Sequence, residues 1–122
     1  MKGRILVVDD SGLARRGTRR VLEGAGYSVV EAEDGMVALE RYFVEKPDLV
    51  LLDLVMKGMY GLEVLAKLRE LDPGARVIVL SADIQTSSRQ MVNDAGAAAF
   101  LNKPVAPGDL LAAVSGVLGQ GT

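Results

Sequence analysis

Five short segments rich in apolar residues alternate along the chain with longer segments of helical periodicity. They are expected to be strands, at Ile5–Val8, Tyr27–Glu31, Asp48–Asp53, Arg76–Leu80 and Ala98–Leu101. The run Leu49–Leu52 is apolar at every position rather than at alternate ones, which is typical of a strand with both faces buried. Because strand and helix alternate throughout, we predict an α/β fold in which helices cover both faces of a parallel sheet.

The segments between the strands carry the signals that begin and end helices. Ser11 and Asp34 are placed to cap the first two helices, and Gly108 or Asp109 to cap the last. The expected helices are Leu13–Leu22, Met36–Val44, a third with the apolar stripe Leu62, Leu65, Ala66 and Leu68, Ile84–Ala95, and Asp109–Leu118. Neither a repeat nor a linker interrupts this order, so we expect residues 1–122 to form one domain with its core at about residues 3–119.

Composition excludes several classes of chemistry. The chain has neither histidine nor cysteine, which rules out a Ser-His-Asp triad, a thiolate or imidazole zinc site, a disulfide and a phosphohistidine carrier. Its 14 basic and 16 acidic residues give no electrostatic reason to expect nucleic acid or a membrane as a direct partner. The run Ile5–Val8 is too short for a membrane span or a signal peptide, so the expected location is the cytoplasm.

Polar residues stand where four of the strands end. Asp9 and Asp10 follow the first strand, Asp53 ends the third, Ser81 follows the fourth, and Lys103 comes shortly after the fifth. An aspartate after a strand is usually a turn former or a helix cap, so each residue alone says little. Since the carboxyl ends of parallel strands meet at one edge of a sheet, however, we expect these side chains to converge.

Three converging carboxylates repel one another and need a counter-charge. Oxygen ligands favour a hard cation such as Mg²⁺, which combines a few carboxylates with water and phosphate oxygens. Lys103 adds a point charge suited to a phosphate. We therefore predict a site for a phosphoryl group, with a carboxylate as its nucleophile.

The chain resembles the response-regulator receiver family over its whole length. The matching segments, in the same order and at the same intervals, are Ile5–Ser11, Leu51–Met56, Gly61, Val79–Ala82 and Phe100–Pro104. The resemblance implies a doubly wound (βα)5 flavodoxin-like fold, with a five-stranded parallel sheet in the order 2-1-3-4-5. It also implies two-component phosphorelay signalling rather than metabolic catalysis, the chain catalysing only its own phosphorylation and slow dephosphorylation.

By this resemblance, Asp53 accepts the phosphoryl group of a phosphohistidine on a sensor histidine kinase or phosphotransfer protein. Mg²⁺ would be bound by Asp10, by Asp53, by Asp9 largely through water, and by the backbone carbonyl of Val55. Lys103 would pair with the phosphoryl oxygens. These roles are implied by the family and are expectations for this chain.

Ser81 and Phe100 take the places of the family's switch residues. The resemblance implies that the Ser81 hydroxyl moves to the phosphate and that the Phe100 ring moves into the space it leaves. The surface of helix four, strand five and helix five would change and control a downstream effector protein or output domain. Simpler interpretations exist, because Phe100 suits a core and the pair Asp9-Asp10 suits a helix cap.

Two other functions stay open at this point. A flavodoxin-like cofactor binder would share the fold, although the charges of Asp9 and Asp10 disfavour a flavin phosphate after the first strand. The other is a degenerate receiver that acts as an interaction module without phosphorylation. A basic face formed by Arg15, Arg16, Arg19 and Arg20 could dock the phosphoryl donor or simply be solvated.

Two positions bear on how the loop after Asp53 behaves. Lys57 stands where the family usually has proline, which predicts a more mobile loop. Val55 is apolar and cannot orient an attacking water, which predicts slow self-dephosphorylation unless Asp83 performs that role.

Overall fold

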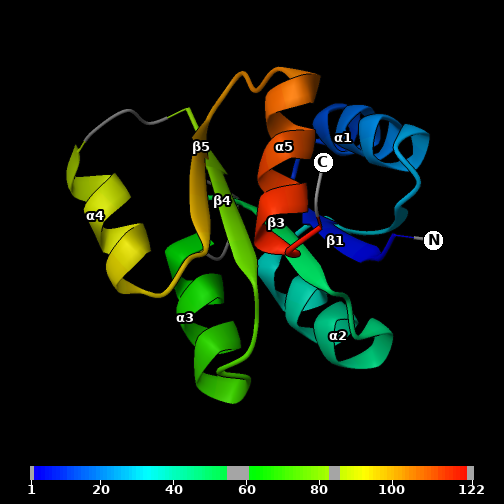
Figure 1. Ribbon diagram of the computed structural model, residues 1–122. Coiled ribbons are helices and arrows are strands. Elements are labelled where there is room, and N and C mark those ends of the chain that lie inside the picture. The colour runs from blue at the N-terminus through cyan, green and yellow to red at the C-terminus, as the bar shows by residue number, and fades with distance from the viewer. Residues whose placement is uncertain (1, 55–60, 83–85, 121–122) are drawn as a thin grey trace.

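The computed structural model describes residues 2–54, 61–82 and 86–120, in which five strands alternate with five helices (Figure 1). The strands are β1 (Arg4–Val8), β2 (Ser28–Ala32), β3 (Leu49–Asp53), β4 (Val77–Ser81) and β5 (Ala99–Asn102). The helices are α1 (Gly12–Gly24), α2 (Gly35–Glu45), α3 (Gly61–Leu71), α4 (Thr86–Asp94) and α5 (Pro107–Val117). The start predicted for the fourth helix, Ile84, lies outside the described residues.

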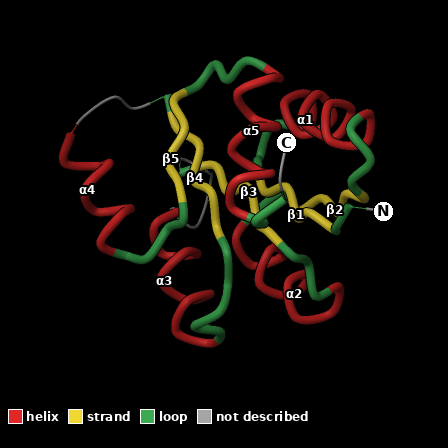
Figure 2. Tube along the Cα trace, viewed as in Figure 1, coloured by secondary structure: helices red, strands yellow, loops and turns green. Residues whose placement is uncertain are grey.

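The strands form one sheet in the order β2-β1-β3-β4-β5, and every described pair is parallel (Figure 2). Both the order and the parallel arrangement confirm the predicted fold. The order reverses at β1, since β2 lies on one side of it and β3 on the other. In open α/β sheets the crevice at such a reversal, beyond the carboxyl ends of the strands, is where ligands bind.

The fully apolar strands supply two cores, one on each face of the sheet. Successive side chains of a strand point to opposite faces, so Leu49 and Leu51 pack with α1 and α5, whereas Val50 and Leu52 pack with α2, α3 and α4. All four of these side chains are at most 1% exposed. Burial on both faces fixes the register of β3, and with it the position of Asp53 at the end of the strand.

The capping predictions hold for the first two helices and fail for the last. The side chains of Ser11 and Asp34 accept hydrogen bonds from the backbone of α1 and α2, as expected. In α5, Ala106 is the N-cap and no described side chain caps the helix, so the prediction of Gly108 or Asp109 is wrong. Pro107 at the first helical position has no N–H to satisfy and a φ already suited to a helix, so the helix begins there.

Among the helices that the structure describes, none combines the length and the apolar character that crossing a membrane requires.

Candidate functional site

The carboxylates of Asp9, Asp10 and Asp53 meet at the carboxyl ends of the strands. One oxygen from each lies within 4.8 Å of the others. The reason is the pairing of β1 with β3, in which Val8 lies opposite Leu52, so the residues that follow these two positions lie side by side. Asp9 is 7% exposed and Asp53 is partly buried, whereas Asp10 is exposed. The predicted convergence of the three carboxylates is therefore confirmed.

Lys103 brings a positive charge to this cluster from beyond the end of β5. Its Nζ donates to Asp9 Oδ2 at 3.0 Å and lies 3.4 Å from Asp53 Oδ2. Its backbone N–H donates to the carbonyl of Ser81 at 2.8 Å, which ties the loop after β5 to the end of β4. Burial lowers the pKa of Lys103, but the hydrogen bond that its ammonium donates to Asp9 and the charges of both carboxylates outweigh burial and raise that pKa overall. The lysine therefore remains a cation.

Ser81 and Phe100 lie on the adjoining strands, β4 and β5. Ser81 ends β4 and is 1% exposed, and Phe100 lies opposite Val79 in the same strand pair. The ring of Phe100 packs against the core on the α2–α4 face, which agrees with its simpler interpretation as a core aromatic. Phe100 also lines a surface hollow of about 470 Å³ between α4 and β5.

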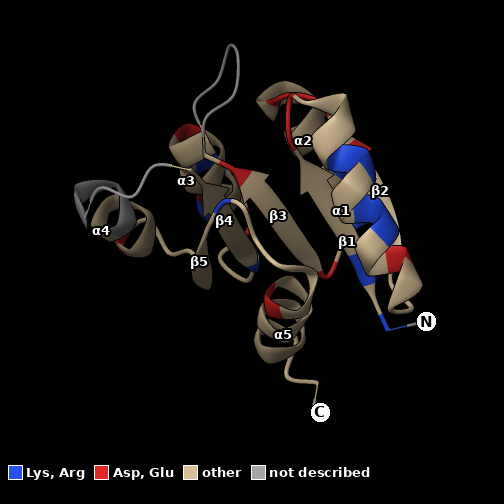
Figure 3. Cartoon of the chain, turned by 90° about the horizontal axis from the view of Figure 1, so that it is seen from above, with Lys and Arg blue, Asp and Glu red and all other residues tan. Residues whose placement is uncertain are grey.

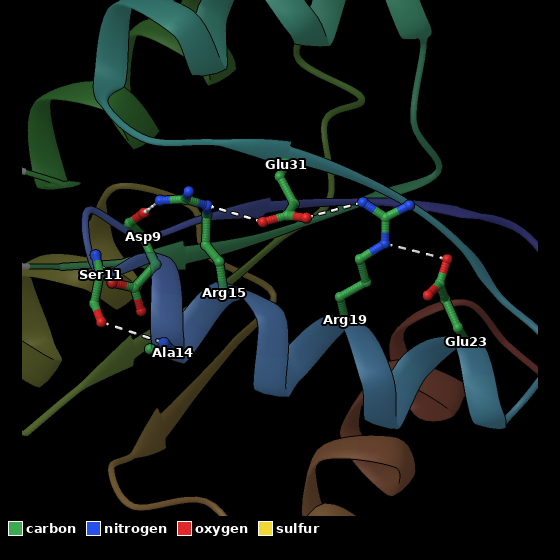
Figure 4. Close-up of polar contacts among 7 residues, drawn as sticks. All are labelled: Asp9, Ser11, Ala14, Arg15, Arg19, Glu23 and Glu31. Carbon is green, nitrogen blue, oxygen red and sulfur yellow. Dashed lines mark hydrogen bonds and ion pairs between the residues drawn. The ribbon is translucent and has the colours of Figure 1, made fainter.

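The loop that carries Asp9 and Asp10 is held by contacts that the sequence did not reveal. Asp9 Oδ1 accepts from the backbone N–H of Ser11 at 2.9 Å, and the Asp9 carbonyl accepts from the Arg15 guanidinium at 2.7 Å (Figure 4). Ser11, rather than Asp9, caps α1 by accepting from the N–H of Ala14. The interpretation of the aspartate pair as a helix cap is therefore replaced by one in which Asp9 faces the cluster and Ser11 caps the helix.

The basic residues along α1 (Figure 3) fall into two groups. Arg15 and Arg19 turn toward the sheet and bind the two oxygens of Glu31 on β2, at 3.0 and 2.9 Å (Figure 4). The hydrogen bond from Arg19, followed by that from Arg15, lowers the pKa of Glu31 in spite of its partial burial. Arg16 and Arg20 are exposed. Half of the predicted basic face thus serves internal pairing rather than an open surface.

The donors gathered here suit a hard cation and a phosphoryl group. Carboxylate oxygens at this spacing are the ligands that Mg²⁺ prefers, and the Lys103 ammonium can contact anionic oxygens beside it. Three predicted positions lie outside the described residues: Val55 as a carbonyl ligand, Lys57 in the following loop, and Asp83.

Comparisons with known proteins agree on one family. The family model described as "Response regulator receiver domain" matches residues 5–115. The response regulator MprA of Mycolicibacterium vanbaalenii is 42% identical over 122 residues, which are 100% of this chain and 53% of that protein. MprA of Mycobacterium avium is 42% identical over 115 residues, 94% of this chain and 50% of that protein. The chain thus spans about half the length of the curated relatives that it matches.

Solved structures that resemble this chain belong to the same family. A CheY-like receiver domain protein from Methanospirillum hungatei JF-1 superposes with a TM-score of 0.91 at 34% identity, covering 95% of this chain and 93% of that one. CheY in a CheX-CheY-BeF3-Mg²⁺ complex from Borrelia burgdorferi superposes with a TM-score of 0.89 at 30% identity, covering 93% and 87%.

Proposed function

Because the chain belongs to the response regulator receiver domain family, we propose that it is a switch controlled by phosphorylation of Asp53. The observation that carries this proposal is the meeting of Asp53 with Asp9, Asp10 and Lys103 at one edge of the sheet. A flavin phosphate bound after β1 would meet the negative charges of Asp9 and Asp10, so the acidic cluster favours a phosphoryl acceptor over a flavin binder. A receiver that works without phosphorylation would have no need of this cluster.

The proposed reaction is a transfer from nitrogen to oxygen. A carboxylate oxygen of Asp53 attacks the phosphorus of a phosphohistidine on a sensor histidine kinase or phosphotransfer protein. The new P–O bond forms as the P–N bond breaks, and the leaving imidazole keeps the electron pair and takes up a proton. Lys103, 3.4 Å from Asp53, is placed to hold a phosphoryl oxygen throughout.

The carboxylates of Asp9, Asp10 and Asp53 would hold Mg²⁺, with the carbonyl of Val55 as a further ligand by family resemblance. The chemistry that Mg²⁺ would supply there is neutralisation of charge on the phosphoryl oxygens during transfer. Asp9 has a second role, because its contact with Lys103 keeps the ammonium over the cluster. The reverse process, hydrolysis of the aspartyl phosphate, is proposed to be slow, since Val55 cannot orient water.

Phosphorylation is proposed to act on the rest of the molecule through Ser81 and Phe100. Ser81 ends β4, and Phe100 lies on the adjoining strand β5, where it lines the hollow beside α4. A movement of Ser81 toward Asp53 would give the ring room to follow. The changed surface of α4, β5 and α5 would then contact a downstream effector protein or output domain. The phosphoryl group needs only to bind one of two arrangements better to shift the population.

The remaining features of the proposal follow from the sequence. Residues 1–122 are proposed to form a single receiver domain with its core at about residues 3–119, acting in the cytoplasm on protein partners rather than on nucleic acid or membranes. It would catalyse its own phosphorylation and dephosphorylation and no other reaction.

Intact-mass measurement after incubation with acetyl phosphate tests the proposal. We expect one phosphoryl adduct that requires Mg²⁺, disappears with a chelator, and is absent from Asp53→Asn, which keeps the shape of the side chain. Hydrogen exchange on the phosphorylated protein should change in α4, β5 and α5. Full labelling of Asp53→Asn, or labelling of the native chain without Mg²⁺, would contradict the assignment of Asp53 and its metal.

A further inference from the structure

Arg15 connects three parts of the molecule through two hydrogen bonds that point in different directions. From α1, its Nε donates to Glu31 on β2 at 3.0 Å and its terminal nitrogen donates to the backbone carbonyl of Asp9 at 2.7 Å (Figure 4). The side chain is 16% exposed. Because the guanidinium is planar and its donors have fixed directions, these two contacts determine where the group lies.

Asp9 is held at each of its polar groups. Its N–H donates to the carbonyl of Ala32 at 3.2 Å, and its two carboxylate oxygens accept from Ser11 at 2.9 Å and Lys103 at 3.0 Å. The remaining group, the carbonyl, accepts from Arg15. Arg15 thus completes the fixing of a residue that is 7% exposed.

These contacts also determine the direction of Asp10. The carbonyl of Asp9 belongs to the peptide unit before Asp10, and the N–H of Ser11 belongs to the unit after it. Since each peptide unit is planar, fixing one group in each of the two units fixes the backbone dihedral angles of the residue between them. The Asp10 side chain projects from this backbone, and one of its carboxylate oxygens lies within 4.8 Å of those of Asp9 and Asp53.

We infer that Arg15 is a positioning residue for the metal-binding carboxylates: it holds the Asp9 carbonyl so that Asp10 projects into the cluster. This inference rests on the proposed function, in which Asp9, Asp10 and Asp53 bind Mg²⁺. Glu31 contributes to this positioning, because it holds the Arg15 guanidinium in place and offsets its positive charge near a cation site. Arg19 binds the same carboxylate but reaches Glu23 instead of Asp9.

A positioning role for Arg15 and a purely electrostatic effect of its charge predict opposite changes in Mg²⁺ affinity when the residue is replaced. A positive charge near a cation site repels the cation, so its removal should strengthen Mg²⁺ binding if charge alone matters. Loss of a group that orients a ligand weakens binding instead. Arg15→Gln and Arg19→Gln each remove one positive charge and one partner of Glu31, but only Arg15→Gln releases the Asp9 carbonyl. Arg19→Gln is therefore the matched control.

The test is calorimetric titration of each metal-free protein with Mg²⁺ alone. We expect the dissociation constant to rise about tenfold in Arg15→Gln, the lower end of what loss of a ligand-orienting group costs. It should rise in Arg15→Lys as well, because a single ammonium cannot reproduce two directed contacts. Arg19→Gln should bind within about twofold of the native chain. In metal-free protein, the Ser11 amide should exchange faster in Arg15→Gln than in Arg19→Gln.

The outcomes separate this inference from the function on which it rests. Equal or tighter Mg²⁺ binding by Arg15→Gln, with a native chain that binds, would overturn the positioning role alone, as would unchanged exchange at Ser11. If Arg15→Gln does not fold, Arg15→Lys decides the question by the same comparison. Failure of the native chain to bind Mg²⁺ would overturn the metal site and the positioning role together.

Discussion

Gly61→Ala should destabilise the protein, even though replacing a helical glycine by alanine normally stabilises a helix. Gly61 begins α3, and its N–H donates to the carbonyl of Leu54 at 2.8 Å. A Cβ at this position would lie 2.5 Å from the Asp53 carbonyl oxygen, 2.7 Å from Leu54 Cα and 2.8 Å from the Leu54 carbonyl oxygen. All three are backbone atoms of the last residue of β3 and of the residue that follows it, and a change of rotamer cannot move them away.

The expected cost follows from these contacts. Overpacking in a well-packed interior costs about 1–3 kcal/mol, and contact with backbone places this substitution at about 3 kcal/mol. With a urea m-value of about 2 kcal/mol/M for a chain of this size, the unfolding midpoint should fall by about 1.5 M. Relief of the clash must displace Asp53 or Leu54, so labelling by acetyl phosphate should slow as well.

Gly17→Ala provides the matched control in α1. No described atom of another part of the chain lies within 4 Å of a Cβ placed there, so only the gain in helix propensity remains. That gain is about 1 kcal/mol, which should raise the urea midpoint by about 0.5 M. Chemical unfolding followed by circular dichroism measures both variants. A Gly61→Ala midpoint equal to or above the native one would refute the steric argument.

Three further predictions concern single contacts. Lys103→Met should bind Mg²⁺ more tightly, since a competing cation is removed, yet accept a phosphoryl group about a hundredfold more slowly. Calorimetry measures the Mg²⁺ affinity and labelling by acetyl phosphate measures the rate. Weaker Mg²⁺ binding would count against this role of the lysine. Arg19 and Arg15 hold the pKa of Glu31 below its unfolded value of about 4.3, so the contribution of Glu31 to stability is present above that pH and lost on acidification. Between pH 7 and pH 3 the urea midpoint of Glu31→Gln should therefore fall less than that of the native chain. Equal falls in the two proteins would be contrary evidence. Burial, followed by the hydrogen bond that the Tyr42 hydroxyl donates to Asp72 at 2.6 Å, raises the pKa of Tyr42 above the unfolded value of about 10. The free energy of unfolding should therefore fall as the pH rises past 10, and less steeply in Tyr42→Phe than in the native chain. Identical alkaline slopes in the two proteins would refute this.

The positions of the acidic residues could be predicted because they depend on strand ends alone. Once Leu49–Leu52 is recognised as a strand buried on both faces, Asp53 must come at its carboxyl end, and Asp9 must come at the carboxyl end of another strand of the same parallel sheet. Lys103 follows by the same reasoning. The family resemblance added the order of the strands, which local patterns do not determine.

The contacts that hold the site could not be predicted, because they depend on which side chains reach one another. Arg15 and Arg16 are neighbouring arginines that look alike in the sequence, but the position of Arg15 on α1 directs its side chain toward Glu31 and Asp9. The cap of α5 was missed because Gly108 and Asp109 are the usual capping types, whereas Pro107 begins the helix by its fixed φ. Gly61 could be recognised as part of a motif, but the reason for it needs the nearby backbone of Asp53.

The central claim is that the Asp53 carboxylate, of the three in the cluster, becomes phosphorylated. Reduction with borohydride converts an aspartyl phosphate to homoserine, which peptide mapping by mass spectrometry locates in the chain. After treatment with acetyl phosphate and Mg²⁺, we predict homoserine at position 53 and none at positions 9 and 10. Homoserine at position 9 or 10, or its absence from position 53 in a protein that carries the phosphoryl adduct, would contradict the account.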